Sequence, residues 1–417
     1  MRSKLIAVAI AAGLGLCSVT AAAAPSPQAV AGTSSNDLEM LKAQLAALQA
    51  KVVELEQRSD AQSEINVSNG QAVAEATNVT AASDKRLAAV EKAINNTSLS
   101  GKMFFDFTNI DEKNSDSGKT DKSGLGFDVK RFYLGFDHKF NDVWSANLTT
   151  DFQYSSAVGA TEVFVKKAYV QGKFSDAAVM RVGSADMPWI PFVEGYYGFR
   201  YVENTLTDRL KYGNSADWGL HLGGNLGQSK SVNYAVSMVN GGGYKNPGRS
   251  KGVDFEARVG FVPVDHMVVA VGGYSGHRGQ ETENLDASHT ANRGDLMVAW
   301  SSDAFRVGAE YFTAKNWNNV LSLAADKANG YSVWGSVVVA DGVSLFARYD
   351  NTDLSKKLDR KANDTYYNAG VEFQVTKGFK LAGVWKHGSV DKSILLLPTH
   401  VQNVKTNEFG VFGEVAF

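Results

Sequence analysis

The chain has 417 residues and a formal net charge of −2, with 42 basic and 44 acidic side chains. This balance leaves no basic excess and argues against a nucleic-acid partner. With 40 glycines, 7 prolines, 11% aromatic residues and a mean hydropathy of −0.20, the chain is too polar for a helical membrane protein. The values fit strands that have one apolar and one hydrated face.

The N-terminus predicts export. Arg2 and Lys4 precede a short apolar run, and small residues follow it. This pattern predicts a secretory signal peptide over residues 1–23, with cleavage after Ala23, and then a linker over 24–36. No later stretch approaches about 18 consecutive apolar residues, so a membrane-spanning helix is not expected.

The single cysteine, Cys17, lies inside this predicted signal peptide. Leu16 precedes it, whereas a lipoprotein signal needs a small residue at that position. Cys17 is therefore expected to be removed with the signal. The mature chain would then have no cysteine, which excludes disulfides and thiolate metal sites.

Residues 37–97 follow a heptad pattern with Leu38 at position a. Apolar residues fill positions a and d near both ends of the segment: Leu38, Leu41, Leu45, Leu48, Val52, Leu55, Leu87, Val90 and Ile94. So narrow a stripe favours a coiled coil over a helix packed on a globular core. Asn66 and Asn69 would fix the register, and Gly70 predicts a local interruption. The leucines at position a do not fit a parallel dimer, so a trimer is expected.

From Leu99 onward the period changes to two, which predicts strands. Sixteen are predicted, near residues 99–109, 125–139, 143–154, 163–174, 178–184, 217–226, 231–239, 252–262, 267–276, 292–301, 305–314, 330–340, 343–351, 365–375, 379–387 and 406–417. Short turns alternate with long polar connections, as in transmembrane barrels and not in soluble sandwiches. We therefore expect an all-β fold, a 16-stranded antiparallel transmembrane β-barrel over residues 98–417. An even strand number places both termini, and the coiled coil, in the periplasm.

Apolar and polar residues alternate along most predicted strands. Phe255 and Val259, for example, share one parity, while Glu256 and Arg258 share the other. We expect the apolar set to face lipid and the polar set to face the barrel interior. The register is hardest to read on the fourth and ninth strands; on the fourth, two lysines are adjacent. The chain ends on Phe417, which we interpret as an assembly signal that closes the barrel.

The connection over residues 186–216 is long and rich in aromatic and charged residues. Such a loop is usually functional, and we expect it to fold into the barrel and narrow it. The alternative is that its aromatic residues contact a neighbouring subunit or form an external cap. The candidate pore-lining residues are Arg131, Lys167, Arg181, Glu194, Arg200, Glu203, Asp208, Arg209, Lys211, Arg258 and Arg348. Charges within the loop balance, so Arg131, Lys167 and Arg181 would give a weak preference for anions.

Three short runs carry a resemblance to a known family. The runs at 130–136 (KRFYLGF), 167–170 (KAYV) and 180–183 (MRVG) are similar to those of the phosphate-selective porin O and P superfamily. The layout of the whole chain resembles that of trimeric Gram-negative porins. This resemblance implies a homotrimer in the outer membrane that admits small hydrophilic solutes by passive diffusion. Its partners would be membrane lipid, the barrel-assembly machinery and, through the coiled coil, the cell wall.

The resemblance does not establish phosphate as the substrate. The family's specificity depends on interior ladders of arginine and lysine. In this chain the basic residues on the interior parity are offset by acidic residues such as Asp151, Asp254 and Glu310.

Motifs for catalysis occur only as near matches in one glycine-rich connection. Residues 243–250 have the spacing of a phosphate loop, but Arg249 stands where lysine is required. Residues 248–252 match the Gly-x-Ser-x-Gly nucleophile motif of hydrolases. That motif requires a turn from a strand into a helix, and here a strand is predicted to follow. We therefore expect no catalytic residue, cofactor or metal site. A structural tether through the coiled coil is the second function considered, and an outer-membrane lipase is a weak third.

Overall fold

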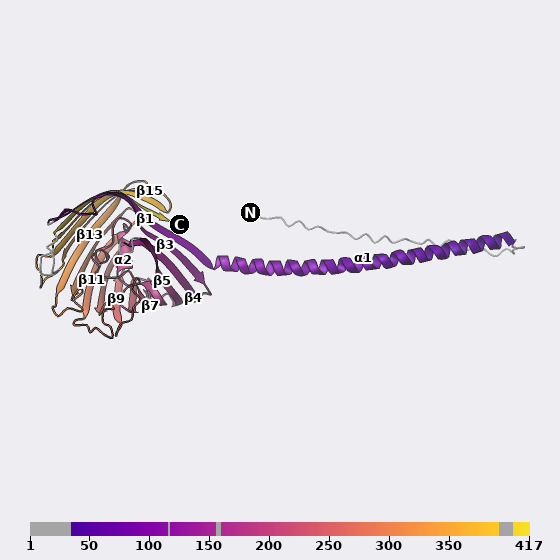
Figure 1. Ribbon diagram of the computed structural model, residues 1–417, viewed down its shortest axis with the longest axis horizontal. Coiled ribbons are helices and arrows are strands. Elements are labelled where there is room, and N and C mark those ends of the chain that lie inside the picture. Colours follow the sequence, from indigo (N-terminus) through magenta and orange to yellow (C-terminus); the bar gives the residue numbers. More distant parts are fainter. Residues whose placement is uncertain (1–34, 116, 156–159, 392–402) are drawn as a thin grey trace. The chain divides into compact units, whose positions relative to one another are not determined.

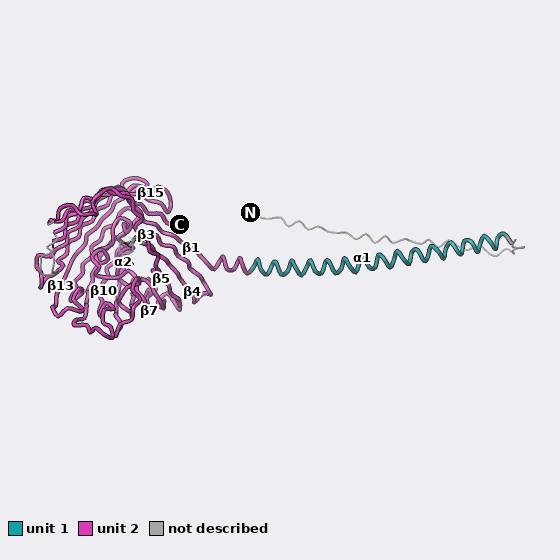
Figure 2. The backbone as a smooth tube through the Cα atoms, viewed as in Figure 1, with its two compact units in different colours: residues 1–88 teal, residues 89–417 magenta. Residues whose placement is uncertain are grey.

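The computed structural model describes residues 35–115, 117–155, 160–391 and 403–417 (Figure 1). The predicted signal peptide and nearly all of the predicted linker lie outside the described residues. The chain divides into two compact units, residues 1–88 and 89–417, coloured separately in Figure 2. The helix and the sheet are therefore described one after the other.

Helix α1 (Ser35–Asn95) is continuous over 61 residues. The interruption expected at Gly70 is absent: one glycine costs about 1 kcal/mol relative to alanine, which a helix of this length tolerates. The apolar residues of the heptad are exposed along its whole length; Leu41, for example, is 62% exposed. Among the described residues, no helix is long and apolar enough to cross a membrane.

The described part of residues 97–416 forms one antiparallel sheet that closes on itself (Figure 1). Its strands are β1 (Thr97–Asn114), β2 (Gly118–Lys119), β3 (Gly124–Lys139), β4 (Trp144–Ser155), β5 (Ala160–Ser175), β6 (Ala178–Asp186), β7 (Ala216–Leu226), β8 (Val232–Val239), β9 (Asp254–Phe261), β10 (Met267–Gly276), β11 (Ala291–Ser301), β12 (Phe305–Lys315), β13 (Lys327–Ala340), β14 (Val343–Asp353), β15 (Asn363–Thr376), β16 (Phe379–Asp391) and β17 (Val404–Ala416). Sixteen of these described strands correspond to the sixteen predicted. The additional one, β2, is a two-residue strand within a long connection.

Pairing of β1 with β17 closes the barrel. Their register runs from Lys102 opposite Ala416 to Asn114 opposite Val404. Phe417 extends this pairing, because its N–H donates to the Gly101 carbonyl and its carbonyl accepts from the Gly101 N–H, both at 3.0 Å. Every long strand thus has a hydrogen-bonded neighbour on both sides, which leaves no open edge.

Side-chain burial alternates along the strands as the sequence predicts. In β9, Asp254, Glu256 and Arg258 are buried inside the barrel, while Phe255 and Val259 are about half exposed on the outside. The same alternation runs through β12 and β14. A barrel with a polar interior and an apolar outer surface follows from this pattern.

Aromatic residues mark both ends of the apolar outer surface. Toward the long connections, Tyr311 lies opposite Tyr331 and Tyr349 opposite Tyr367, with 6.1 Å between the rings of Tyr331 and Tyr349. Toward the short turns, Phe305 lies six positions from Tyr311 on the same face of β12. Six residues span roughly 20 Å of strand. Two aromatic rows flanking an apolar band are the outer surface of a membrane barrel.

Two β-bulges explain why inward and outward side chains do not alternate regularly along β3 and β5. The register of β1 against β3 shifts between Phe104 and Phe105 and leaves Lys130 as an extra residue. The register of β4 against β5 shifts between Thr149 and Thr150 and leaves Lys166 as an extra residue. A bulge lets two consecutive side chains point to the same side of a sheet. Each bulge therefore turns an adjacent basic pair toward the interior.

Candidate functional site: the barrel interior

The connection between β6 and β7 lies inside the barrel. It contains α2 (Ile190–Tyr197), which the ribbon shows within the ring of strands (Figure 1), and α3 (Leu206–Arg209). Its apolar side chains are buried, with Trp189, Tyr201 and Leu206 fully inaccessible. Gly198 ends α2 in the left-handed conformation (φ 79°), and a Cβ there would collide with the Arg306 guanidinium. Glycine therefore allows the chain to turn close to the wall.

Two buried glutamates hold the first part of this connection. The Trp189 backbone N–H donates to Glu256 on β9 at 2.9 Å, and its indole N–H donates to Glu310 on β12 at 2.8 Å. The Thr207 hydroxyl also donates to Glu310, at 3.3 Å. Because these carboxylates point inward from separate strands, they fix the connection across the interior.

An arginine pair holds the second part. Arg209 forms ion pairs with Asp350 (3.1 Å) and Asp364 (2.5 Å), which point inward from β14 and β15. Arg348 on β14 pairs with Asp350 at 2.7 Å and also donates to the Asn204 carbonyl. Both arginines were predicted to line the pore, and the structure places them in these ion pairs between the connection and the wall.

The third attachment is to the wall formed by β15, β16 and β3. The Tyr201 hydroxyl donates to Glu372 at 2.7 Å, and Glu203 lies 3.5 Å from the Lys386 ammonium. Burial alone would raise the pKa of Glu203, but the charges of Lys386, Lys130 and Arg209 outweigh it and lower the pKa to about 2. Glu203 therefore stays ionised at neutral pH.

Two cavities remain between the connection and the wall that includes β3. Their volumes are about 480 Å³ and about 270 Å³, and both are lined by Arg131, Arg200 and Lys211. The lining of the two together holds five basic and three acidic residues: Lys130, Arg131, Arg200, Lys211, Lys245, Asp128, Glu203 and Asp208. The open part of the interior is therefore positively charged.

The charges around these cavities differ in how tightly they are paired. Arg200 lies 2.6 Å from Glu194 and 3.3 Å from Asp208, within the connection itself. Arg131 lies 3.1 Å from Asp151. The Lys211 side chain is 73% exposed and 4.0 Å from Asp208. Lys211 is thus more open to a passing solute than Arg131 or Arg200.

The remaining predicted residues lie along other parts of the wall. Lys167 forms a 2.6 Å ion pair with Asp186, where the connection begins. Arg181 donates to Gln171 at 2.8 Å, near the short-turn end of β5 and β6. Arg258 donates to the Pro188 carbonyl at 2.9 Å and stacks 3.6 Å over the Phe192 ring. Lys167 and Arg258 therefore contact the start of the connection, whereas Arg181 does not.

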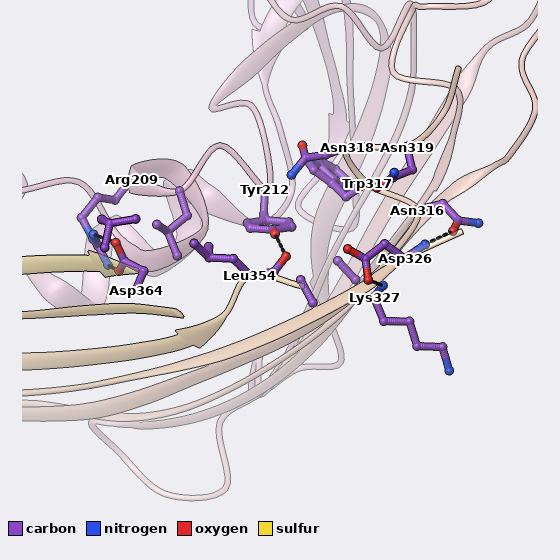
Figure 3. Close-up of a pocket in the computed structure, with 14 residues that line it drawn as sticks. Arg209, Tyr212, Asn316, Trp317, Asn318, Asn319, Asp326, Lys327, Leu354 and Asp364 are labelled. Atoms are coloured by element: carbon purple, nitrogen blue, oxygen red, sulfur yellow. Dashed lines mark hydrogen bonds and ion pairs between the residues drawn. The ribbon is translucent and has the colours of Figure 1, made fainter. Parts of the chain in front are cut away.

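A third cavity, of about 460 Å³, lies against β12 to β15 (Figure 3). Its lining mixes apolar side chains with amides, among them Tyr212, Trp317, Leu354 and Asn316. The Trp317 indole N–H donates to the Lys211 carbonyl at 2.8 Å, so this wall also holds the connection in place. Arg209, Asp326 and Asp364 are the charged side chains that face it, since Lys327 extends away, so this side lacks the positive excess of the other two cavities.

Sequence reasoning missed several interior lysines, among them Lys130, Lys166, Lys245 and Lys386. An adjacent basic pair within an alternating strand was the available signal for Lys130 and Lys166, since only a bulge turns both residues of such a pair inward. Lys245 belongs to the connection between β8 and β9 and reaches the same cavity as Arg131. Burial, followed by the nearby charge of Arg131, lowers the pKa of Lys245.

Among the described residues, no group of three histidine, cysteine or acidic side chains is placed to hold a metal ion. A closed antiparallel sheet with an apolar band outside and charged residues inside defines the class of transmembrane β-barrels. Residues 98–190 match the sequence model of the family phosphate-selective porin O and P. No curated protein matches the chain significantly in sequence.

Solved structures share the fold at low sequence identity. The outer membrane channel DcaP of Acinetobacter baumannii superimposes with a TM-score of 0.55 at 11% identity, covering 77% of this chain and 97% of that one. The anion-selective porin from Comamonas acidovorans gives 0.53 at 13%, covering 77% and 99%. OmpT of Vibrio cholerae gives 0.51 at 14%, covering 77% and 97%. The chain is thus similar in fold to outer-membrane barrels over nearly the whole length of each.

Proposed function

We propose that this protein is an outer-membrane porin through which small hydrophilic solutes diffuse passively. The observation that carries the proposal is the pair of charged cavities beside the connection over residues 186–216, inside a closed barrel. A barrel of sixteen strands is wide enough to hold an aqueous channel around such a connection. The match of residues 98–190 to a porin family supports the same function.

The channel prefers anions weakly. Basic residues outnumber acidic ones in the lining of the two cavities, and the Lys211 side chain among them is 73% exposed. A positive lining within low-dielectric walls raises the local concentration of anions. One similar structure is an anion-selective porin by its own description. The acidic residues of the same lining keep the preference mild.

The mature protein is a homotrimer with a coiled coil over residues 37–97 in the periplasm. The apolar heptad residues of α1 are about half exposed or more, and a lone helix in water gains nothing from such a stripe. Two further copies would bury it, and leucine at position a disfavours a dimer. The helix precedes a strand that starts at the short-turn end, which is the periplasmic end of such barrels.

The candidate site suits transport better than catalysis. Its arginines and carboxylates are used to hold the connection against the wall, as the ion pairs of Arg209 and Arg348 illustrate. A tethering role through α1, whose 61 residues reach roughly 90 Å, is compatible with the channel and is the second function we consider.

Liposome swelling tests the channel directly. Purified full-length protein in phosphatidylcholine liposomes should admit small sugars and amino acids at rates that fall with solute size. Liposomes that contain the protein but swell no faster than empty ones in every solute would contradict the proposal.

A further inference from the structure

The outer surface of the barrel carries paired lysines just beyond its aromatic row. On β12, Lys315 lies two outward positions past Tyr311, and on β13, Lys327 lies two outward positions past Tyr331. Lys315 and Lys327 are direct register partners on the sheet, and both are exposed. Like charges opposite each other on one face of a sheet repel, so this pair is unfavourable unless an anion lies between them.

A third lysine joins this pair from the next connection. The Lys356 backbone N–H donates to the Lys327 carbonyl at 2.8 Å, and its ammonium donates to Asn329 at 2.6 Å. Asn329 has the same outward parity as Lys327, so the Lys356 side chain lies on the outer face. The connection over residues 354–362 also exposes Lys357, Arg360 and Lys361. We call Lys315, Lys327 and Lys356 the outer basic patch.

Two acidic residues next to the patch, Asp326 and Asp359, are buried and accept hydrogen bonds from the backbone N–H groups of Lys327, Lys357 and Lys361. Asp353 lies 3.8 Å from Lys356, and Asp391 is exposed at the end of β16. Among the described residues, no ion pair involves Lys315 or Lys327. The patch therefore keeps an excess of positive charge.

The position of the patch determines which molecules it can contact. Lys327 extends away from the interior cavity and from the other labelled residues around it (Figure 3). The long connections mark the external side of a membrane barrel, and aromatic rings mark the level of the lipid headgroups. Lysines immediately beyond such a row stand beside the headgroups and not in the path of a solute.

We propose that the outer basic patch binds the phosphate groups of anionic lipids in the external leaflet. The proposal rests on the outer-membrane location given above. Each lysine near an anionic lipid surface contributes attraction that falls off within a Debye length. A lipid phosphate lying between Lys315 and Lys327 would remove the repulsion between them. Its acyl chains would lie along the apolar band below the tyrosines.

The test compares two double variants in full-length protein. Lys315→Gln with Lys327→Gln removes two charges from the patch, and Lys139→Gln with Lys173→Gln removes two exposed lysines at the opposite end of the barrel. The probe is bisphosphorylated lipid A in uncharged detergent micelles, and native mass spectrometry measures the bound lipid. Binding of the same lipid without phosphates is measured as a control. Inorganic phosphate is added as a competitor in a separate measurement.

We expect the Lys315–Lys327 variant to bind lipid A about tenfold or more weakly than wild type, since each lysine contributes separately. The Lys139–Lys173 variant should bind like wild type, and exchange of Lys315 and Lys327 for arginine should preserve binding. Equal affinity of the glutamine variant and wild type, or equal binding of the phosphate-free lipid, would overturn the proposal. Displacement of the lipid by equimolar inorganic phosphate would overturn the assignment to lipid.

Failure of the channel function is distinguishable from failure of this inference. Because the patch faces away from the interior, liposome swelling by the Lys315–Lys327 glutamine variant should equal that by wild type. Faster or slower swelling would place these lysines in the solute path and contradict the lipid assignment.

Discussion

Lys211 and Arg131 illustrate how the same charge acts differently in the barrel interior. Arg131 lies 3.1 Å from Asp151, whereas the Lys211 side chain is mostly exposed beside the same cavities. An ion pair presents little net charge to a passing ion, while an exposed ammonium presents all of it. Selectivity should therefore depend more on Lys211 than on the paired arginines.

Exchange of Lys211 for glutamine should shift the reversal potential toward cations. The shift should be largest at low salt, where the Debye length is about 30 Å at 0.01 M, and small at 1 M. Bilayer recordings in a salt gradient measure it. Lys122→Gln is the matched control, because Lys122 is similarly exposed but lies in the connection between β1 and β3. Equal shifts in the two variants would mean that Lys211 does not face the solute path.

Deletion of Phe417 should block assembly of the barrel in the membrane. The residue makes two backbone hydrogen bonds with Gly101 at the closing seam, and its ring covers the Gly101 Cα where a side chain would collide. Phe417→Tyr keeps the ring and the backbone bonds and serves as the control. Heat-modifiable mobility of membrane fractions on gels reports assembly. A deleted chain that reaches the folded form at the wild-type level would refute this role.

Single residues also show where sequence reasoning succeeds and fails. The parity of Glu256 and Arg258 could be read directly, because an uninterrupted strand keeps its alternation. Lys130 and Lys166 were missed, because a bulge shifts the parity and the adjacent basic pair is its one local sign in each strand. The partners of Arg209, more than 140 positions away on β14 and β15, depend on how the closed sheet brings strands together.

The connection over residues 186–216 is the element on which the channel depends. Its aromatic and charged composition suggested an interior position, but composition could not distinguish charges that hold it from charges that face solute. In the structure, Arg209 holds the connection, since it joins α3 to Asp350 and Asp364. Removing one partner from such a buried network leaves the others uncompensated, at a cost of about 3–5 kcal/mol.

Exchange of Arg209 for methionine should loosen this connection while the barrel stays closed. Asp350 and Asp364 would repel each other without the guanidinium, so α3 should detach from the wall. We expect larger, noisier single-channel currents and faster proteolysis within residues 186–216. Arg360→Met, which removes an exposed arginine in the connection between β14 and β15, is the control. Unchanged currents and cleavage would show that the remaining contacts hold the connection without Arg209.

In the whole molecule, the helix and the barrel have different sequence repeats and are stabilised by different interactions. The barrel closes its own hydrogen bonds through β1 and β17, whereas α1 has an exposed apolar stripe. Removal of residues 37–97 should therefore leave a folded barrel that still conducts. It should also lower the stability of the trimer, because the coiled coil no longer contributes to association.

Gel mobility before and after heating reports the barrel of this truncated chain, and light scattering in detergent reports its oligomeric state. A truncated chain that fails to fold would show that the two units are coupled. A wild-type mass near that of one chain in detergent would contradict the trimer itself.

We propose above that the barrel interior is an open path lined by a small excess of positive charge. Single-channel recording of the purified full-length protein in a planar phosphatidylcholine bilayer, under a gradient of potassium chloride, tests it most directly. We predict discrete conductance steps and a reversal potential on the chloride side of zero. Absence of steps from a protein shown to be folded in the same bilayer, or a reversal potential on the potassium side, would contradict the account.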